Sequence, residues 1–540
     1  MGWLLLATIM MPLIGAFACL AVAQRSDLAR IVALVVSLIT LAGVIGLISQ
    51  FPADGKNASE FALLEFKWLS GVSGNIFDVR FSLGLDGLGL WLYGLTAVLV
   101  VSSILVSWES INTRQSLFYA MLLMLECGCL GVFTARDIIL FYVFFEFTLI
   151  PLFFLIGIWG SEDRRYAAAK FFIYTLAGSV LTFLGLLAVV LWQWQTQRLT
   201  TDAPMVFSIP ELTQSLRAHP MPVAYQHWVF LALLAGFAIK VPLVPFHTWL
   251  PLAHVQAPTA GSVLLAGVLL KIGTYGFIRF SIPLLPDATV FFVPLLLWVS
   301  VVGIVYGALV ALAQSDMKRL IAYSSVSHLG FCMLGLFALN RLGIQGSVLQ
   351  MVNHGISTGG LFAIIGMLYE RYHTRRIKDL QGLAAKIPII AFFMIVFTLS
   401  SIGLPGLNGF AGEILILIGV FQRAGPWNGW ELNQFKWIAI LALSGVVLGA
   451  WYMLWLVQRV FFGTVKEPVG DDEQHSVPDI KGREIGALAP LAVLALWIGV
   501  YPQFFLQRMA PTLNEITDHT QQQVRIGQSD PPKEKLARAR

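Results

Sequence analysis

Four ionisable side chains lie inside long apolar stretches of this sequence. Glu146 stands among aromatic residues in FYVFFEFTLIPLFF, Lys240 in GFAIKVPLVPFHTWLP, Lys271 in AGVLLKIGTYGF and Glu413 in GLPGLNGFAGEILILIGV. A charge at the centre of a bilayer costs at least about 2.5–3.5 kcal/mol, so such groups usually face a protein interior or a water-filled path. Burial and neighbouring charges shift the protonation of both side-chain types, so these residues predict proton transfer.

Glu146 and Lys240 are candidate partners. Burial disfavours the ammonium form of a lysine, and a neighbouring carboxylate restores it. Moving or screening that carboxylate would release a proton, which makes the pair an electrostatic switch. A static ion pair that fixes helix packing is the alternative, and for Glu146 alone the alternative is a neutral, hydrogen-bonded acid. Glu126 is another buried acid, which we rank below Glu146.

Lys271 has no acidic residue at helical spacing on its own predicted helix, so we interpret it as a proton carrier. His328, in SSVSHLGF, and His354, in MVNHGIST, lie between Lys271 and Glu413 in chain order. Histidine titrates near neutral pH, so the two rings are candidates for a relay. The alternative for each histidine is a core residue with satisfied hydrogen bonds, and for Lys271 it is a side chain that reaches back to the membrane surface.

The sequence predicts no cofactor, metal or redox centre in this chain. It contains no P-loop, no dinucleotide-binding glycine motif and no haem or cluster pattern of cysteines. We interpret His247 and His254, which follow Lys240, as structural or gating residues, because their spacing matches no zinc motif. The net charge of +5 gives no support to nucleic-acid binding.

The elements that position these residues are predicted to be transmembrane helices. Of the 540 residues, 57% are hydrophobic and only 12% are charged, whereas soluble proteins carry about 25% charged residues. The sequence therefore predicts an all-α polytopic membrane protein. A span needs about 20 apolar residues. Fourteen segments qualify, at 3–23, 30–50, 86–108, 116–134, 138–158, 168–194, 227–249, 260–281, 288–312, 320–339, 345–369, 388–422, 436–462 and 485–507.

The seventh and twelfth predicted spans, which carry Lys240 and Glu413, contain prolines and glycines that break a helix. Spans four to eight and nine to thirteen are each five helices long, with the broken helix fourth in each set. Because five is odd, the two sets would insert with opposite topology, as in inverted-repeat transporters. We therefore divide the chain into a three-helix segment (1–115), two five-helix repeats (116–281 and 288–462), and a polar loop, last span and polar tail (463–540).

An even number of spans places both termini on one side of the membrane. The loops after odd-numbered spans carry more lysine and arginine than the loops after even-numbered spans. Short cytoplasmic loops are enriched in these residues, so we predict that the odd loops are cytoplasmic and that both termini are not.

The run KVPLVPFHTWLPLAHVQAPTAGSVLLAGVLLKIGTYGFIRF resembles the core of antiporter-like subunits of respiratory complex I and of Mrp-type antiporters. FSLGLDGLGLWL, LIAYSSVSHLGF and GLPGLNGFAGE extend the likeness over roughly 84–462, and FYVFFEFTLIPLFFLIGIWG is similar to the chain M group of complex I. The resemblance implies a fourteen-helix fold with two inverted repeats. It also implies that Glu146, Lys240, Lys271 and Glu413 match the family's proton-path residues, with His328 and His354 along a hydrated axis. Some relatives carry an acid where this chain has Gln256, and we assign that position no role.

The favoured hypothesis is a proton-translocating membrane subunit of NADH:quinone oxidoreductase, in a bacterial inner membrane. Its expected partners are the adjacent membrane subunits, the lipid bilayer and, indirectly, the peripheral redox arm. One alternative is a subunit of an Mrp-type Na⁺/H⁺ antiporter, which shares the same site residues. The other is a structural spacer, against which the buried charges argue.

Overall fold

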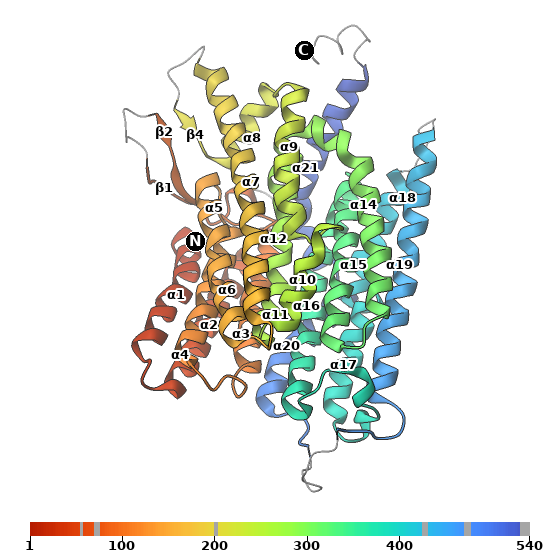
Figure 1. Cartoon of the computed structure of the whole chain (residues 1–540). Coiled ribbons are helices and arrows are strands. Elements are labelled where there is room, and N and C mark those ends of the chain that lie inside the picture. The colour runs from red at the N-terminus through yellow and green to blue at the C-terminus, as the bar shows by residue number, and fades with distance from the viewer. Residues whose placement is uncertain (54–57, 70–75, 199–203, 424–429, 469–476, 530–540) are drawn as a thin grey trace.

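The computed structural model describes residues 1–53, 58–69, 76–198, 204–423, 430–468 and 477–529 (Figure 1). Within these residues, twelve segments are long and apolar enough to cross a membrane. They are α1 (Gly2–Ala21), α2 (Ser26–Gln50), α4 (Gln115–Val132), α5 with α6 (Ile138–Phe147 and Leu149–Trp159), α7 (Arg164–Arg198), α9 (Val223–Lys240), the run from α11 to α13 (Thr259–Leu284), α14 (Pro286–Leu312), α15 (Met317–Phe337), α16 (Arg341–Tyr372), α19 (Trp430–Phe461) and α20 (Gly482–Val500).

Two shorter apolar helices, α3 (Leu90–Val106) and α17 (Pro388–Ser401), occupy the places of the third and twelfth predicted spans. The all-α polytopic architecture predicted from composition is therefore confirmed for the described residues. The twelfth prediction, a single segment over 388–422, corresponds to two helices, α17 and α18 (Asn408–Arg423).

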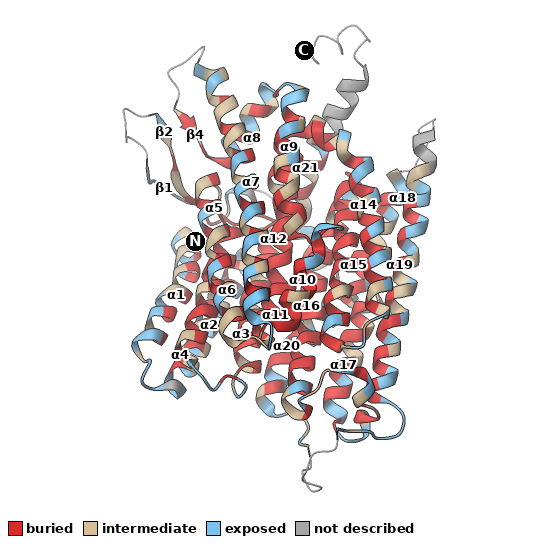
Figure 2. Cartoon of the chain, in the orientation of Figure 1, coloured by how far each residue is buried: buried red, intermediate tan, exposed pale blue. Residues whose placement is uncertain are grey.

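The centre of the bundle is formed by three segments. In Thr259–Leu284 and in α16, the most apolar 18-residue stretch is fully buried, and in α15 it is 94% buried. In α2, by contrast, only 28% of the corresponding stretch is buried. Figure 2 shows the same contrast between the red central helices and the outward, pale-blue faces of α7 and α19. Lys271, His328 and His354 belong to these three central segments, so the ionisable residues lie at the core of the bundle.

Capping side chains fix where three of the functional helices begin. The Asp137 carboxylate accepts hydrogen bonds from the backbone N–H groups of Ile139 at 2.9 Å and Leu140 at 3.3 Å at the start of α5. Asp316 caps α15, and Asn340 caps α16, in the same way. Such caps satisfy N–H groups that have no partner inside the helix, and each contributes about 1 kcal/mol.

The segment that carries Lys271 is not a regular α-helix. It runs through α11 (Thr259–Leu264), η3 (Leu265–Leu269), α12 (Leu270–Gly276), η4 (Phe277–Ser281) and α13 (Ile282–Leu284), and η3 and η4 are π-helical. A π-helical turn widens the helix and is found often at functional sites. The sequence predicts an uninterrupted helix over 260–281, and its pattern gives no sign of the two π-helical turns.

The two long loops hold small elements beside helices. An antiparallel pair joins β1 (Leu64–Lys67) to β3 (Arg80–Leu83), and a parallel pair joins β2 (Phe77–Asp78) to β4 (Met205–Val206). The helix η1 (Ala58–Glu60) lies in the first loop, and α8 (Ile209–Ala218) lies in the second. The strands β1, β2 and β4 and the helix α8 lie toward the same end of the bundle in Figure 1.

The C-terminal part differs from the predicted span and tail. The last span, α20, ends at Val500 rather than near 507, and a further helix, α21 (Gln503–Ser529), follows it. Trp91 of α3 donates its indole N–H to the Phe505 carbonyl of α21 at 3.0 Å. The polar tail predicted from 508 is helical through Ser529, and Met509 and Leu513 in it are fully buried. Its last residues, 530–540, lie outside the described residues.

Candidate functional site

Two interruptions of the helical backbone border the site. Helix α9 ends at Lys240, and the chain continues through η2 (Phe246–Thr248) into α10 (Trp249–Gln256). Pro242 has no N–H group to continue the α9 ladder. In the other half, residues 402–407 separate α17 from α18. Gly403 and Gly406 lie there at φ +73° and +93°, a left-handed conformation that glycine adopts without steric cost.

Lys271 and His354 are in direct contact at the centre of the bundle. Lys271 is fully buried, and its Nζ lies 2.7 Å from His354 Nδ1. The same Nζ donates a hydrogen bond to the carbonyl oxygen of Ala266, in the π-helical turn η3. Neither partner is an acid, and Nε2 of His354 has no hydrogen-bond partner among the described residues. The two bases are therefore held at the distance of a proton transfer.

His328 connects this pair to Glu413. Its ring centroid lies 5.5 Å from that of His354. On the other side, its Nδ1 lies 3.5 Å from Glu413 Oε1, and its Nε2 is within 3.1 Å of Ser401 Oγ. The structure thus brings Lys271, His354, His328 and Glu413 into one series, in which His354 comes before His328, the reverse of their order along the chain.

Glu413 lies against the interruption between α17 and α18. A Cβ atom added to Gly403 would lie 2.6 Å from Glu413 Oε2, so a larger residue would displace the carboxylate from this place. Gln350 of α16 donates an N–H to Glu413 Oε1 at 3.2 Å. Asn353 donates to the Asn408 carbonyl at 2.7 Å and so joins α16 to the start of α18.

The amide-bearing residues around Glu413 were not selected in the sequence analysis. Gln350, Asn353, His354 and Ser357 lie at helical spacing i, i+3, i+4 and i+7, inside an otherwise apolar span. This spacing places them on one face of the helix. A search for polar residues with that period in LQMVNHGIST would have detected this buried polar stripe.

The first half of the site is arranged differently. Lys240 is 5% exposed, and its Nζ lies 4.7 Å from the centre of the Phe145 ring, a cation–π contact. The charge of Glu146 acts on Lys240 electrostatically, but no ion pair joins them among the described residues. Glu146 is only partly buried, and its Oε1 has no hydrogen-bond partner there. The closely bonded ion pair considered as an alternative is therefore absent from this structure.

The two halves meet where α9 packs on α12. A Cβ atom on Gly273, two residues from Lys271, would lie 3.0 Å from the Cβ of Lys240. No hydrogen bond joins the two lysine side chains in the described part of the chain. The same part contains no group of three or more His, Cys, Asp or Glu side chains placed to hold a metal ion. The site is therefore a series of titratable groups, and its first and second halves meet at the contact of α9 with α12.

A fold of this kind, with buried acids and bases along the centre of a helical bundle, defines a class of ion-translocating membrane subunits. Residues 135–435 match the family described as "NADH:quinone oxidoreductase/Mrp antiporter, TM". The chain is 41% identical over 521 residues to NADH-ubiquinone oxidoreductase chain 4 of Chondrus crispus, covering 96% of this chain and 98% of that one. It is also 41% identical over 493 residues to NADH-quinone oxidoreductase subunit M of Rhodobacter capsulatus, covering 91% and 89%.

Two solved structures have a similar fold. A chain of respiratory complex I from Thermus thermophilus superposes with a TM-score of 0.79 at 30% identity, covering 96% of this chain and 99% of that one. A chain of the Mrp complex from Dietzia has a TM-score of 0.76, but at 20% identity that likeness concerns the fold alone. The chain belongs to the antiporter-like membrane subunits of NADH:quinone oxidoreductase, of the subunit M or chain 4 type. The resemblance found in the sequence is thereby confirmed.

Proposed function

We propose that this chain carries protons across the membrane through Glu146, Lys240, Lys271, His354, His328 and Glu413, while partner subunits reduce quinone. The observation that supports this most strongly is the close series of titratable groups from Lys271 to Glu413, which begins in the most buried helices. Insertion into a membrane would be easier without these groups, so their presence favours a functional role.

In the second half, the transfers run between neighbouring groups of this series. A Lys271 ammonium gives a proton to Nδ1 of His354, and the same ring loses a proton from Nε2 toward His328. His328 in turn delivers a proton to the Glu413 carboxylate, 3.5 Å from its Nδ1. Histidine suits this task because its two nitrogens can accept and donate at near-neutral pH. Glu413 would then release the proton at the interruption between α17 and α18.

In the first half, the electrostatic contact between Glu146 and Lys240 acts as a switch. With no direct ion pair, the strength of this interaction depends on the distance between the two helices and on the water between them. A partner subunit that moves or screens Glu146 would lower the affinity of Lys240 for its proton. The proton would then pass to Lys271 across the contact of α9 with α12.

The proposal includes the inverted-repeat arrangement, with repeats over 116–281 and 288–462. The interruption after Lys240 and the one after Ser401 lie at corresponding places in the two sets and support it. We further propose that the odd loops face the cytoplasm, that both termini face away from it, and that the chain lies in a bacterial inner membrane. Its neighbours there would be other membrane subunits of the complex and, beyond them, the peripheral redox arm.

Lys271→Met tests the proposal directly, because methionine keeps the volume of the side chain and removes the proton site. The measurement is NADH-driven proton uptake by vesicles containing the reconstituted complex, together with quinone reduction. We expect the complex to assemble and pumping to fall roughly tenfold or more. The matched control, Lys67→Met, changes an exposed lysine of β1 and should pump normally. Normal pumping by Lys271→Met would refute the route and favour a structural spacer.

A different experimental result would establish the Mrp-type alternative. A purified complex that contains Mrp-type subunits instead of redox subunits, and that exchanges Na⁺ for protons in the absence of NADH, would establish it. The 41% identity to subunit M and chain 4 over nearly the whole chain argues for the redox complex.

A further inference from the structure

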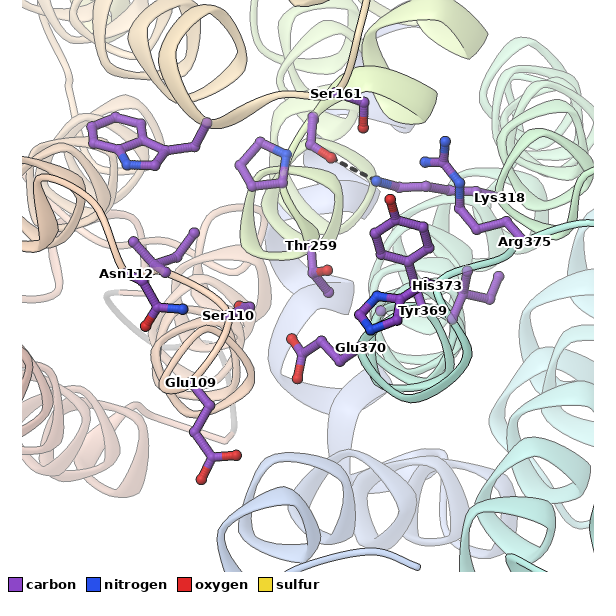
Figure 3. Close-up of a pocket in the computed structure, with 16 residues that line it drawn as sticks. Glu109, Ser110, Asn112, Ser161, Thr259, Lys318, Tyr369, Glu370, His373 and Arg375 are labelled. Carbon is purple, nitrogen blue, oxygen red and sulfur yellow. Dashed lines mark hydrogen bonds between the residues drawn. The ribbon is translucent and has the colours of Figure 1, made fainter. Parts of the chain in front are cut away.

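Two cations on the wall of a pocket hold the end of one short helix. The pocket, of about 480 Å³, lies among the loops that follow the odd-numbered spans, and Lys318 and Arg375 both line it (Figure 3). Lys318 is 6% exposed, and its Nζ donates a hydrogen bond to the Ala257 carbonyl at 2.6 Å, the dashed line in Figure 3. Nη1 of Arg375 donates to the Val255 carbonyl at 2.8 Å. Both acceptors stand at the C-terminal end of α10, the helix that follows the first interruption.

The last carbonyls of a helix have no partner inside it and carry partial negative charge, so lysine and arginine side chains stabilise them. The carbonyl of Gln256, between the two acceptors, is bonded within the first half of the chain, by the N–H of Ser161 at 2.9 Å. Lys318 and Arg375, however, lie 61 and 120 residues from their acceptors, in the second half. These two bonds therefore join the halves of the chain, which a cap supplied by neighbouring residues would not do.

The two donors belong to one bonded unit of the second half. The N–H of Met317 donates to the Arg375 carbonyl at 3.0 Å, and Oδ2 of Asp316 lies 3.6 Å from Nε of Arg375. The start of α15 is thereby fixed to the loop after α16. These two helices carry His328 and His354, so the unit moves with the second half of the site.

The other end of α10 is bonded to the backbone beside Lys240. Trp249 is the first residue of α10 and is 1% exposed, and its indole N–H donates to the Ile239 carbonyl at 3.0 Å. Ile239 immediately precedes Lys240, the last residue of α9. With eight residues, α10 is about 12 Å long. It therefore connects the second half of the chain to the end of the helix that carries Lys240.

Resting on the proposed function, we infer that Lys318 and Arg375 are positioning residues for the Lys240 switch, which act through α10 and Trp249. Because the contacts are contiguous, a shift of α15 and α16 moves α10 and, with it, the end of α9. That shift changes the separation of Lys240 from Glu146 and hence the strength of their interaction. A change in the second half of the site thereby alters the protonation of the first.

Lys318→Met tests this role, because methionine keeps the stem of the side chain and removes the donor. We expect NADH-driven pumping by the reconstituted complex to fall roughly threefold or more. Lys318→Arg keeps a donor and should retain at least half of the pumping. The matched control is Lys466→Met, which removes another lysine bonded to a backbone carbonyl, that of Lys378 at 2.9 Å, and should pump normally. Normal pumping by Lys318→Met, or an equal loss in Lys318→Arg, would overturn the inference.

Trp249→Phe removes the donor at the other end of α10 and should lower pumping to a similar extent. Because Lys318 and Trp249 act through one helix, the double variant should pump no worse than the more impaired single variant. Trp159→Phe, which removes an indole bonded to the Thr113 carbonyl at 2.8 Å, is the control and should pump normally. Independent losses that multiply in the double variant, or normal pumping by Trp249→Phe, would contradict a connection through α10.

Hydrogen exchange in the purified complex distinguishes this role from that of a local cap. Exchange reports local opening of the backbone. Lys318→Met should speed amide exchange both in α10 and in the last turn of α9, and should leave α2 unchanged. Faster exchange confined to α10 would make Lys318 a local cap and would contradict the inference.

The failure of this inference can be told apart from the failure of the proposed function. If Lys318→Met and Trp249→Phe pump normally while Lys271→Met does not, the proton route stands and the positioning role is wrong. If Lys271→Met also pumps normally, the proposed function is wrong as well.

Discussion

At the scale of single residues, the ionisable side chains in the two halves of the site make different kinds of contact. Lys271 is in hydrogen-bond contact with His354, and His328 lies within 3.5 Å of Glu413. Lys240 instead rests over the Phe145 ring and interacts with Glu146 only at a distance. Direct contacts favour fast transfer, whereas a distant electrostatic pair responds to movement of its surroundings. The first half is therefore suited to control and the second to conduction.

Glu146→Gln and Lys240→Met should each leave the complex assembled and lower proton pumping roughly tenfold. Because the two residues act as one switch, the double variant should pump no worse than either single variant. Pumping and quinone reduction in vesicles measure this. Glu162→Gln, which alters an exposed acid, serves as the control. Additive losses in the double variant would show that the two residues act independently.

At the scale of elements, close helix contacts set the positions of the charged side chains. Helix α9 meets α7 where Gly236 faces Gly178 and Thr182. This contact lies one helical turn before Lys240. A wider spacing between the two helices would move Lys240 relative to Glu146.

Gly236→Ala should displace α9, because the added Cβ would lie 1.9 Å from Thr182 Oγ1 and 2.3 Å from the Gly178 carbonyl oxygen. Overpacking of this kind costs about 1–3 kcal/mol. Gly303→Ala, in α14, is the matched control: its Cβ would meet nothing within 4 Å, and alanine is favoured over glycine in a helix by about 1 kcal/mol. Thermal unfolding of the purified complex should therefore shift downward for Gly236→Ala and not for Gly303→Ala. Equal shifts would contradict this account.

At the scale of the whole molecule, the small strands lie toward one end of the bundle (Figure 1). A pocket lined by Glu109, Lys318 and His373 lies among the loops that follow the odd-numbered spans, at the other end. The sequence predicts that the pocket end is cytoplasmic, because its loops are richer in lysine and arginine. Protons taken up at that end would cross the bundle before leaving at the other.

A cysteine at Trp3, which is 67% exposed, and a second cysteine appended to the C-terminus should both be labelled from the non-cytoplasmic side of sealed vesicles. Arg165→Cys, an exposed position at the start of α7 next to an odd-numbered loop, should be labelled from the other side. Labelling of the two ends from opposite faces would disprove the even number of spans.

Much of this organisation follows from apolar runs and single charges, which a sequence displays directly. The spans, the family and the burial of Lys240, Lys271 and Glu413 could be predicted, because charges inside apolar runs stand out against a background with 12% charged residues. Three features could not. The π-helical turns beside Lys271 depend on tertiary packing, and the helix α21 has a polar composition that resembles a tail. The stack of His254 on Phe362, with ring centroids 4.6 Å apart, depends on chain segments that are far apart in the sequence.

The most direct test of proton transfer to Glu413 compares Glu413→Gln with Glu413→Asp in the reconstituted complex, with NADH-driven pumping and quinone reduction measured together. Glutamine keeps the shape and can accept the N–H of Gln350, but it cannot take up a proton, whereas aspartate keeps the acid. The account predicts that Glu413→Asp retains much of the pumping and that Glu413→Gln loses most of it, roughly tenfold, in a complex that assembles normally. Equal pumping by the two variants would remove Glu413 from the path and contradict the account.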